Sequence, residues 1–134
     1  MSIFLDTGFF LAYYDSRDKY HKRAFALAEK IFSNEFGAVF TSDYIFDEAT
    51  TLTLARKGPL KAAELGEAIL NSEIEVITVL KEVFDSSWKL FKQRKSLSFT
   101  DCTTIEAMKV NGIKKLASFD KGFSQFKKEI KIVG

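Results

Sequence analysis

A short apolar stretch near the beginning of the chain ends in an aspartate, and this stretch constrains the fold most. Residues 3–5 are the strand-favouring residues Ile-Phe-Leu, and they run directly into Asp6, which a Thr-Gly pair follows. An apolar run bounded by such a turn signal predicts a short buried strand. Asp6 would then lie at the carboxyl end of the strand, where open α/β sheets bind their ligands. A carboxylate there is costly to bury unless a cation or hydrogen-bond donors meet it.

Helix and strand patterns alternate along the rest of the chain. The spacing of apolar residues and the capping signals predict helices over residues 8–14, 19–33, 43–57, 60–70, 81–94 and 99–111. Short apolar or alternating runs predict further strands over residues 38–41, 73–79, 116–119 and 130–133. Strands that alternate with helices indicate βαβ units, in which helices cover both faces of a parallel sheet. We therefore predict an α/β fold, a three-layer α/β/α sandwich around a parallel sheet of four to five strands.

The length and composition of the chain restrict its class. With 134 residues and 46% apolar content, residues 1–134 are expected to form a single domain with its own core. No apolar run reaches the ~18 residues of a membrane-spanning helix, and no secretory signal precedes the first strand. The single cysteine, Cys102, cannot form an internal disulfide, and the C-x-x-C pairs of zinc and redox sites are absent. We therefore expect a cytoplasmic protein that does not enter a membrane.

Positive and negative charges are distributed unevenly along the chain. Residues 1–88 contain 9 Lys and Arg and 14 Asp and Glu, a net charge of −5. Residues 89–134 contain 11 Lys and Arg and 4 Asp and Glu, a net charge of +7. Such an asymmetry indicates a polyanionic partner, and the alternative is a lysine-rich face that is merely solvated.

Four acidic residues occupy the positions where a parallel α/β fold presents ligand-binding side chains. Asp6 ends the first strand, and Asp120 directly follows the fourth. Glu48 and Asp101 each lie on the apolar, core-facing side of a predicted helix, because apolar residues recur three, four or seven positions away from them. All four are therefore expected to converge at the carboxyl edge of the sheet.

Each acid taken alone also has a purely structural explanation. Asp6 would cap the helix that follows it, and Glu48 would pair with a basic side chain. Asp101 would complete a capping box with Ser98, and Asp120 would belong to an ordinary Asp-Lys-Gly turn. The structural explanation suffices for any one of them, whereas the four together favour a site.

Like charges at one edge cannot share a poorly solvated site unaided, so either some carboxyl groups stay protonated or a cation neutralises them. Oxygen ligands without cysteine suit Mg²⁺ or Mn²⁺. The only histidine, His21, excludes a His-rich site, and we expect it to be exposed on its helix. A divalent cation lowers the pKa of a bound water and stabilises charge on phosphate oxygens. The acids therefore predict a magnesium or manganese site suited to chemistry on a phosphate.

Four short motifs carry these acids in a fixed order. They are FLDTG at residues 4–8, DYIFDEA at 43–49, SFTDC at 98–102 and SFDKGF at 118–123. In order and spacing the set covers almost the whole chain and resembles the PIN-domain ribonucleases, more narrowly the VapC-like toxins of bacterial and archaeal toxin–antitoxin pairs. The resemblance implies an α/β/α sandwich and Mg²⁺- or Mn²⁺-dependent hydrolysis of RNA phosphodiester bonds.

The resemblance also implies roles for individual residues. Asp6 and Asp101 would be metal ligands, Glu48 a further ligand or the base for the attacking water, and Asp120 a ligand that acts directly or through water. The small hydroxyl residues of the same motifs would hydrogen-bond the carboxylates; these are Thr7 and Ser118.

The toxin type further implies a homodimer and a small antitoxin that inserts a segment into the active-site groove. Aromatic residues favour interfaces, so those between residues 9 and 14 are candidates for lining a dimer or antitoxin groove, with core packing as the alternative for at least half of them. Basic residues of the second part of the chain are candidates for contacts to RNA phosphates. They are Lys92, Arg94, Lys95 and Lys121.

Two other families with an aspartate after the first strand fit the sequence less well. A phosphatase of the haloacid-dehalogenase type needs a second acid two residues after the first, where Gly8 stands, and a receiver domain needs an acidic pair where only Asp6 is present. Two alternatives within the fold stay open. One is a catalytically silent PIN-like module that binds RNA or a protein, and the other is a housekeeping nuclease of RNA processing.

Overall fold

The structure is a computed structural model that describes residues 1–94 and 96–134. Its five strands form one parallel sheet in the order β3-β2-β1-β4-β5, with β1 in the centre. The strands are β1 (Ser2–Leu5), β2 (Ala38–Ser42), β3 (Glu75–Ile77), β4 (Lys115–Ala117) and β5 (Lys131–Val133). The predicted α/β fold with a parallel sheet is confirmed.

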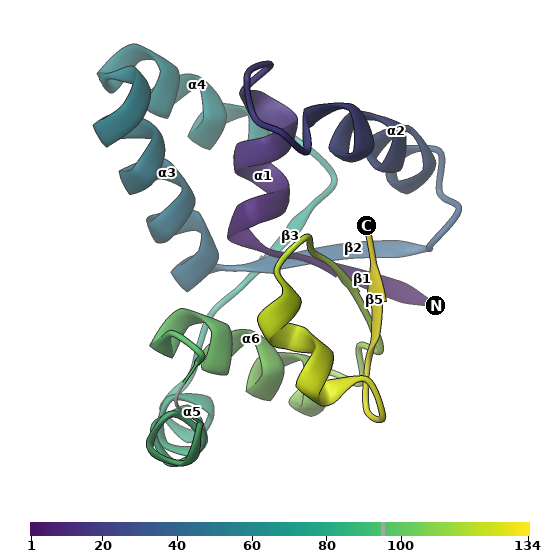
Figure 1. The fold of residues 1–134 in the computed structure, drawn as a ribbon, viewed down its shortest axis with the longest axis vertical. Coiled ribbons are helices and arrows are strands. Elements are labelled where there is room, and N and C mark those ends of the chain that lie inside the picture. The colour runs from purple at the N-terminus through teal and green to yellow at the C-terminus, as the bar shows by residue number, and fades with distance from the viewer. Residues whose placement is uncertain (95) are drawn as a thin grey trace.

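Helices cover both faces of the sheet (Figure 1). They are α1 (Thr7–Tyr14), α2 (His21–Phe32), α3 (Asp43–Lys57), α4 (Pro59–Leu70), α5 (Lys81–Gln93), α6 (Phe99–Val110) and the 3₁₀ helix η1 (Lys121–Phe126). Figure 1 shows α1, α2 and α4 on one side of the sheet and α5 and α6 on the other, and α3 packs against both α4 and α6. No helix within the described residues is long and apolar enough to cross a membrane.

The central strand is buried as predicted. Residues 3–5 are completely inaccessible to solvent, and Phe9 of α1 and Phe123 of η1 belong to the same core. Burial of one large apolar side chain stabilises the folded state by about 1.5–3 kcal/mol. The end of β1 is therefore held firmly in place, and Asp6 with it.

Local signals set the ends of α3. Ser42 caps the helix, because its Oγ accepts a hydrogen bond from Ile45 N–H at 3.1 Å. Gly58 ends α3 at a φ of 90°, which an L side chain rarely adopts, and Pro59 begins α4 in the position where a missing N–H costs nothing. These are the residues from which the sequence predicted the helix boundary.

Two segments differ from the sequence prediction. The strands predicted over residues 73–79 and 116–119 are three residues long, since only the part that pairs with a neighbouring strand is extended. The Asp-Lys-Gly turn continues into η1, which was not predicted. Phe123 and Phe126 are both buried, and their separation of three residues matches the three residues per turn of a 3₁₀ helix.

Candidate active site

The site begins where β1 and β4, two neighbouring parallel strands, both end. Leu5 and Ala117 are register partners, and Asp6 N–H donates to Ala117 O at 3.3 Å. Asp6 follows β1, and Ser118 follows β4 at the same level of the sheet, two residues before Asp120. The topology therefore brings together the first and the last of the four acids.

Asp6 is almost fully buried, with 5% of its surface exposed. The pKa of Asp6 is raised to about 7, chiefly by burial and also by the charges of Asp101 and Asp120. Hydrogen bonds from the Ser118 side chain and from Phe9 N–H, which lies 2.8 Å from Asp6 Oδ1, act in the opposite direction. Asp6 is thus both the cap of α1, as its structural explanation proposed, and a carboxylate without a cationic partner within the described residues.

Asp101 is held in a capping box at the start of α6. Asp101 N–H donates to Ser98 Oγ at 3.0 Å, and Ser98 N–H donates to Asp101 Oδ2 at 3.2 Å. Burial raises the pKa of Asp101, the Ser98 N–H lowers it, and the charges of Asp120 and Glu48 raise it. The predicted capping box is confirmed. It occupies Oδ2, while Oδ1 has no hydrogen-bond partner in the described chain, so a carboxylate oxygen is left for a ligand.

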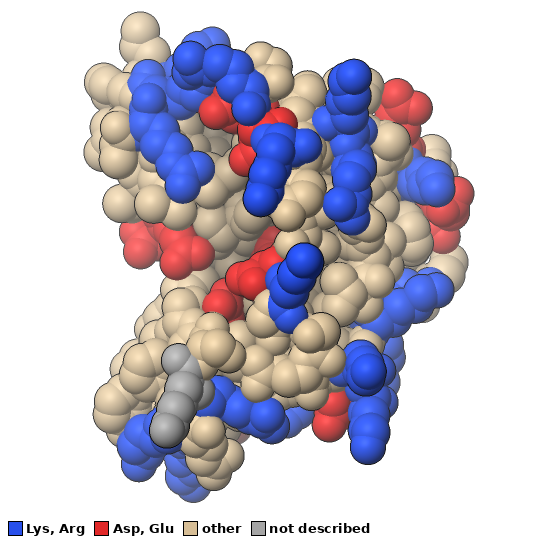
Figure 2. Space-filling view, in the orientation of Figure 1, with Lys and Arg blue, Asp and Glu red and all other residues tan. Residues whose placement is uncertain are grey.

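Glu48 and Asp120 complete the group, the first from α3 and the second from the start of η1. Glu48 is half-buried on α3 and forms no ion pair in the part of the chain that the structure describes, so the basic partner of its structural explanation is not found. Asp120 is exposed and caps η1, because Gly122 N–H donates to Asp120 Oδ1 at 2.8 Å. Figure 2 shows acidic side chains in the hollow between the two helical layers, bordered by Lys and Arg.

The four acids suit a hard divalent cation better than a cluster of neutralising side chains. Burial and neighbouring negative charges raise the pKa of both Asp6 and Asp101, and no Lys, Arg or His within residues 1–94 and 96–134 pairs with any of the four acids. No three metal-ligating side chains in those ranges lie close enough to hold an ion together. An ion here would therefore be held by at most two of these carboxylates, which is the usual number for Mg²⁺, an ion that keeps several waters.

The two hydroxyl residues of the motifs behave differently. Ser118 hydrogen-bonds the Asp6 side chain, and its Oγ accepts from Asp120 N–H at 3.0 Å, so one hydroxyl links two of the acids. Thr7 Oγ1 is buried and has no hydrogen-bond partner among the described residues. The predicted bond from Thr7 to a carboxylate is therefore wrong for this structure, because Asp6 Oδ1 accepts from Phe9 N–H instead. The unpaired hydroxyl is a donor beside Asp6 that a bound group can use.

The basic residues predicted to contact phosphate are scattered. Lys92 Nζ lies 5.9 Å from the centre of the Trp88 ring on α5, and Arg94 lies over the Phe126 ring at 5.0 Å. Lys121 directly follows Asp120 and is exposed. Lys95 is outside the described residues. Of these candidates, Lys121 is the one adjacent to an acid of the site.

Cys102 and His21 take no part in the site. Cys102 is completely buried, and burial raises the pKa of its thiol to about 11, as expected of a small core residue. His21 is half-buried rather than exposed as predicted, because its Nδ1 lies 2.8 Å from Ala12 O and ties the start of α2 to α1.

An aromatic and cationic cluster at the edge of the site was missed from the sequence. Tyr20 and Phe119 stack with ring centres 5.0 Å apart, and the Arg23 guanidinium lies 5.1 Å from the Phe119 ring. Phe119 directly precedes Asp120. Arg23 and Phe119 are far apart in the sequence, and no local pattern relates them, so only the folded chain reveals the pair.

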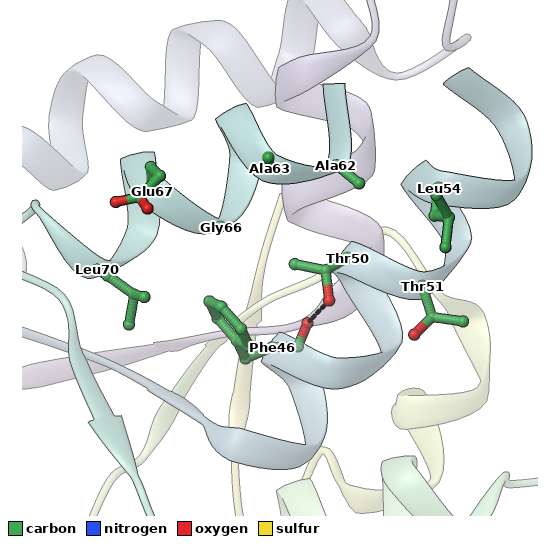
Figure 3. Close-up of a pocket in the computed structure, with 9 residues that line it drawn as sticks. All are labelled: Phe46, Thr50, Thr51, Leu54, Ala62, Ala63, Gly66, Glu67 and Leu70. Carbon is green, nitrogen blue, oxygen red and sulfur yellow. Dashed lines mark hydrogen bonds between the residues drawn. The ribbon is translucent and has the colours of Figure 1, made fainter. Parts of the chain in front are cut away.

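Two apolar depressions lie outside the acidic site. One, of about 180 Å³, is lined by residues of α1, α2, α4 and the segment that precedes β3, and it includes all four aromatic residues between positions 9 and 14: Phe9, Phe10, Tyr13 and Tyr14. The other, of about 350 Å³, is an open groove between α3 and α4 (Figure 3). Its floor is made of the small residues Ala62, Ala63 and Gly66, and Leu54 and Leu70 border it.

The sequence matches that of a known family along nearly its whole length. The family model described as PIN domain matches residues 3–129. A VapC ribonuclease of Archaeoglobus fulgidus is 30% identical, with 92% of this chain and 80% of that protein covered. The 23S rRNA-specific endonuclease VapC20 of Mycobacterium tuberculosis is 27% identical, with 91% of this chain and 92% of that protein covered.

Solved structures share the fold. The crystal structure of Mycobacterium tuberculosis VapC20, described as a Sarcin-Ricin loop cleaving toxin, has a TM-score of 0.80 at 26% identity and covers 92% of this chain and 94% of its own. VapBC2 from Rickettsia felis, bound to a promoter DNA fragment, has a TM-score of 0.69 at 12% identity and covers 99% and 98%. FitAcB from Neisseria gonorrhoeae has a TM-score of 0.69 at 16% identity and covers 98% and 96%.

Proposed function

The chain belongs to the PIN domain family, and on this premise we propose that it is a metal-dependent endoribonuclease that acts as the toxin of a type II toxin–antitoxin pair. One observation carries the proposal: burial and the charges of Asp101 and Asp120 raise the pKa of Asp6, burial and the charges of Asp120 and Glu48 raise that of Asp101, and no basic side chain in the described chain pairs with any of the four. Such a group requires a cation, and a cation held by oxygen ligands suits hydrolysis of a phosphodiester. The identity to a VapC ribonuclease supports RNA as the substrate.

Each side chain of the site has a role in this proposal. Asp6 and Asp101 hold Mg²⁺ or Mn²⁺, because both are partly or wholly buried and neither has a counter-charge. A bound cation of this type lowers the pKa of a water and stabilises charge on the phosphate oxygens. Glu48 binds the metal or accepts the proton of the attacking water, and Asp120 orients water. Ser118 keeps Asp6 and the backbone of Asp120 in place.

The aromatic pocket is the part of the surface that fits an antitoxin. Its lining is almost entirely apolar, and Tyr13 and Phe32 at its border are 37% and 49% exposed. Large apolar side chains left open on a surface mark an interaction site. A small antitoxin that places apolar side chains here would cover the aromatic residues between positions 9 and 14, and this partner would meet the enzyme in the cytoplasm.

The groove between α3 and α4 fits a second copy of this chain. Leu54 and Leu70 are 50% and 59% exposed and border a floor of small residues (Figure 3). A leucine of one copy can therefore enter the small-residue floor of the other, and the reverse contact follows by two-fold symmetry. The homodimer and the single nuclease domain of residues 1–134 are both part of the proposal.

The test is RNA cleavage by the purified protein with Mg²⁺, with Mn²⁺ and with EDTA, alongside two variants on α6. Asp101→Asn keeps an oxygen that can accept the capping bond from Ser98 N–H, so the fold is expected to persist while cleavage falls at least about 100-fold through loss of metal binding. Glu106→Gln, which removes an acid that pairs with Lys109 on the same helix, is the control and keeps activity.

Two results would contradict the proposal. Cleavage by Asp101→Asn at the wild-type rate would remove Asp101 from the site. A folded wild-type protein that binds RNA without cleaving it under any metal condition would instead be the catalytically silent module.

A further inference from the structure

We propose that Arg23, assisted by Lys19, binds a phosphate group of the RNA strand at the edge of the active site formed by the end of β4. The inference rests on the proposed nuclease function and extends it to a substrate-binding residue. It is drawn from three features of the structure: the position of the Arg23 guanidinium, the absence of an acidic partner for it, and the rigidity of its surroundings.

The guanidinium is held against two rings that are fixed to the site. It lies 5.4 Å from the centre of the Tyr20 ring and 5.1 Å from that of Phe119. The two rings are nearly parallel, with 8° between their planes. Phe119 stands between Ser118, which bonds the Asp6 side chain, and Asp120. The Arg23 guanidinium therefore contacts the segment of residues 118–120, which contains Asp120 and the serine that hydrogen-bonds Asp6.

No acidic side chain in the described part of the chain forms an ion pair with this cluster. Lys19 Nζ lies 4.9 Å from the same Tyr20 ring, so two cations share one aromatic residue. Within residues 1–94 and 96–134 neither Arg23 nor Lys19 forms an ion pair. Two like charges around one ring repel each other, and a bound anion would relieve that repulsion. Arg23 is exposed, so its planar set of N–H donors faces solvent.

The backbone that carries the cluster is fixed by local bonds. Asp18 Oδ1 accepts from Tyr20 N–H at 2.8 Å, and the His21 ring bonds Ala12 O of α1. The backbone at Arg23 is therefore fixed before a ligand arrives, and the contacts with the Tyr20 and Phe119 rings restrict the guanidinium, so less entropy is lost on binding. A planar guanidinium matches the geometry of a phosphate through paired hydrogen bonds, which an ammonium cannot do.

The anion that fits is a backbone phosphate of single-stranded or looped RNA. The cluster stands beside acids that would act on one phosphodiester of the strand, so a neighbouring phosphate of the same strand is the nearest negative charge. In Figure 2, Lys and Arg side chains border the acidic hollow. Basic side chains that could bind a phosphate thus lie around the acids of the proposed metal site and not among them. The Tyr20 and Phe119 rings hold the guanidinium through their faces and edges, and the contact is independent of base sequence.

The experiment compares Arg23→Ala, Arg23→Lys and the matched control Lys22→Ala, which removes one exposed charge from the next position on α2. The affinity for a single-stranded RNA oligonucleotide is measured in EDTA between about 50 and 200 mM salt, and kcat and KM are measured with Mn²⁺. Arg23→Ala is expected to weaken binding about 5- to 10-fold and to reduce the slope of log affinity against log salt by about 0.7, the value for one phosphate contact on a single strand.

The variants separate phosphate binding from a structural role. Arg23→Lys should restore the salt slope but not the full affinity, because the charge returns without the planar donors. Arg23→Ala should raise KM with little change in kcat, since the contact exists before and during the reaction. Lys22→Ala should change the affinity less than about twofold at 150 mM salt, where charges beyond about 8 Å are screened.

The outcomes also separate this inference from the proposed function. If the wild-type protein cleaves RNA and Arg23→Ala matches Lys22→Ala in slope and KM, Arg23 binds no phosphate and the nuclease assignment stands. If the wild-type protein binds RNA without cleaving it, the salt slopes still decide the role of Arg23. A wild-type protein that neither binds nor cleaves RNA overturns both.

Discussion

At the scale of single residues, Asp6 has the most unusual environment in the molecule. It is buried at the end of the central strand, caps α1 and feels the charges of Asp101 and Asp120. Its two hydrogen bonds do not compensate for burial, so its pKa is raised to about 7. The apo protein therefore keeps Asp6 protonated over much of the acidic range, and metal binding must displace that proton.

The stability of the apo protein should consequently depend on pH. The pKa of Asp6 is raised from its ordinary value of 3.8 to about 7, so its contribution to stability is present below pH ~4 and is lost as the pH rises to ~7. We expect the free energy of unfolding in EDTA to fall over this window in the wild-type protein. Asp6→Asn, which keeps the oxygen that accepts from Phe9 N–H, should remove most of the fall and be more stable at pH 8 by up to about 4 kcal/mol.

Urea unfolding in EDTA between pH 4.5 and 8 measures this dependence. Asp85→Asn is a suitable control, because Asp85 is a solvent-accessible acid on α5 that pairs with Lys81. Parallel pH curves for the wild-type protein and Asp6→Asn would show that Asp6 titrates normally. A residual slope in Asp6→Asn is expected, since the pKa of Asp101 is raised as well.

At the scale of helices and strands, features with local causes could be predicted and features with distant causes could not. The ends of α3 and the capping box of α6 follow from Ser42, Gly58 and Ser98, which act within a few residues. The 3₁₀ helix η1 depends on burial of its two phenylalanines by the rest of the core, and the short strands depend on which residues find a partner. Sequence patterns do not contain that information.

The same division holds for the site. The four acids could be predicted because each follows a strand or begins or lines a helix. The unpaired hydroxyl of Thr7 and the contact between Arg23 and Phe119 could not, since both result from packing between separate elements. Arg94 shows the reverse: it is a basic residue near an acidic motif in sequence, but it lies over Phe126 and donates to Gln125 at 3.1 Å.

The turn between α2 and β2 offers a test at this scale. Gly37 has a φ of 76°, and a Cβ on it would lie 2.2 Å from Met1 O, the acceptor for Ala38 N–H at the start of the β1–β2 pair. Gly112 has a φ of 66° but open space around it. Both Gly→Ala variants incur about 1–2 kcal/mol of backbone strain. Gly37→Ala should lose about 1–3 kcal/mol more through the clash.

Thermal or urea unfolding of the two variants measures the difference directly. Equal stabilities would mean that the N-terminal residue moves aside freely and that the first pairing of β1 with β2 contributes little. Activity is not expected to change in either variant, because both glycines lie away from the four acids.

At the scale of the whole molecule, the exposed apolar surface indicates how the chain assembles. The α3–α4 groove is bordered by Leu54 and floored by small residues, whereas Leu60, at 84% exposure, lies outside its lining. We expect sedimentation to give twice the mass of one chain for the wild-type protein. Leu54→Lys should shift the protein to the monomer, and Leu60→Lys, which adds the same charge to an even more exposed position, should not.

Three results would be incompatible with the groove as the dimer contact, and the first two are these. One is a wild-type protein that stays monomeric at all concentrations. The other is a dimer that both lysine variants weaken equally. A dimer unaffected by Leu54→Lys would direct attention to the exposed apolar face of α5, where Phe84 and Trp88 are 42% and 49% exposed.

The order of the strands determines when, during synthesis of the chain, the proposed nuclease can become active. β1, made first, is completed on one side by β4, whose residues come more than 100 positions later, and Asp120 follows β4. A ribosome that synthesises the chain therefore holds a product without the pairing that brings Asp6 and Asp120 together. The proposed nuclease is therefore inert until β4 has been synthesised and has paired with β1.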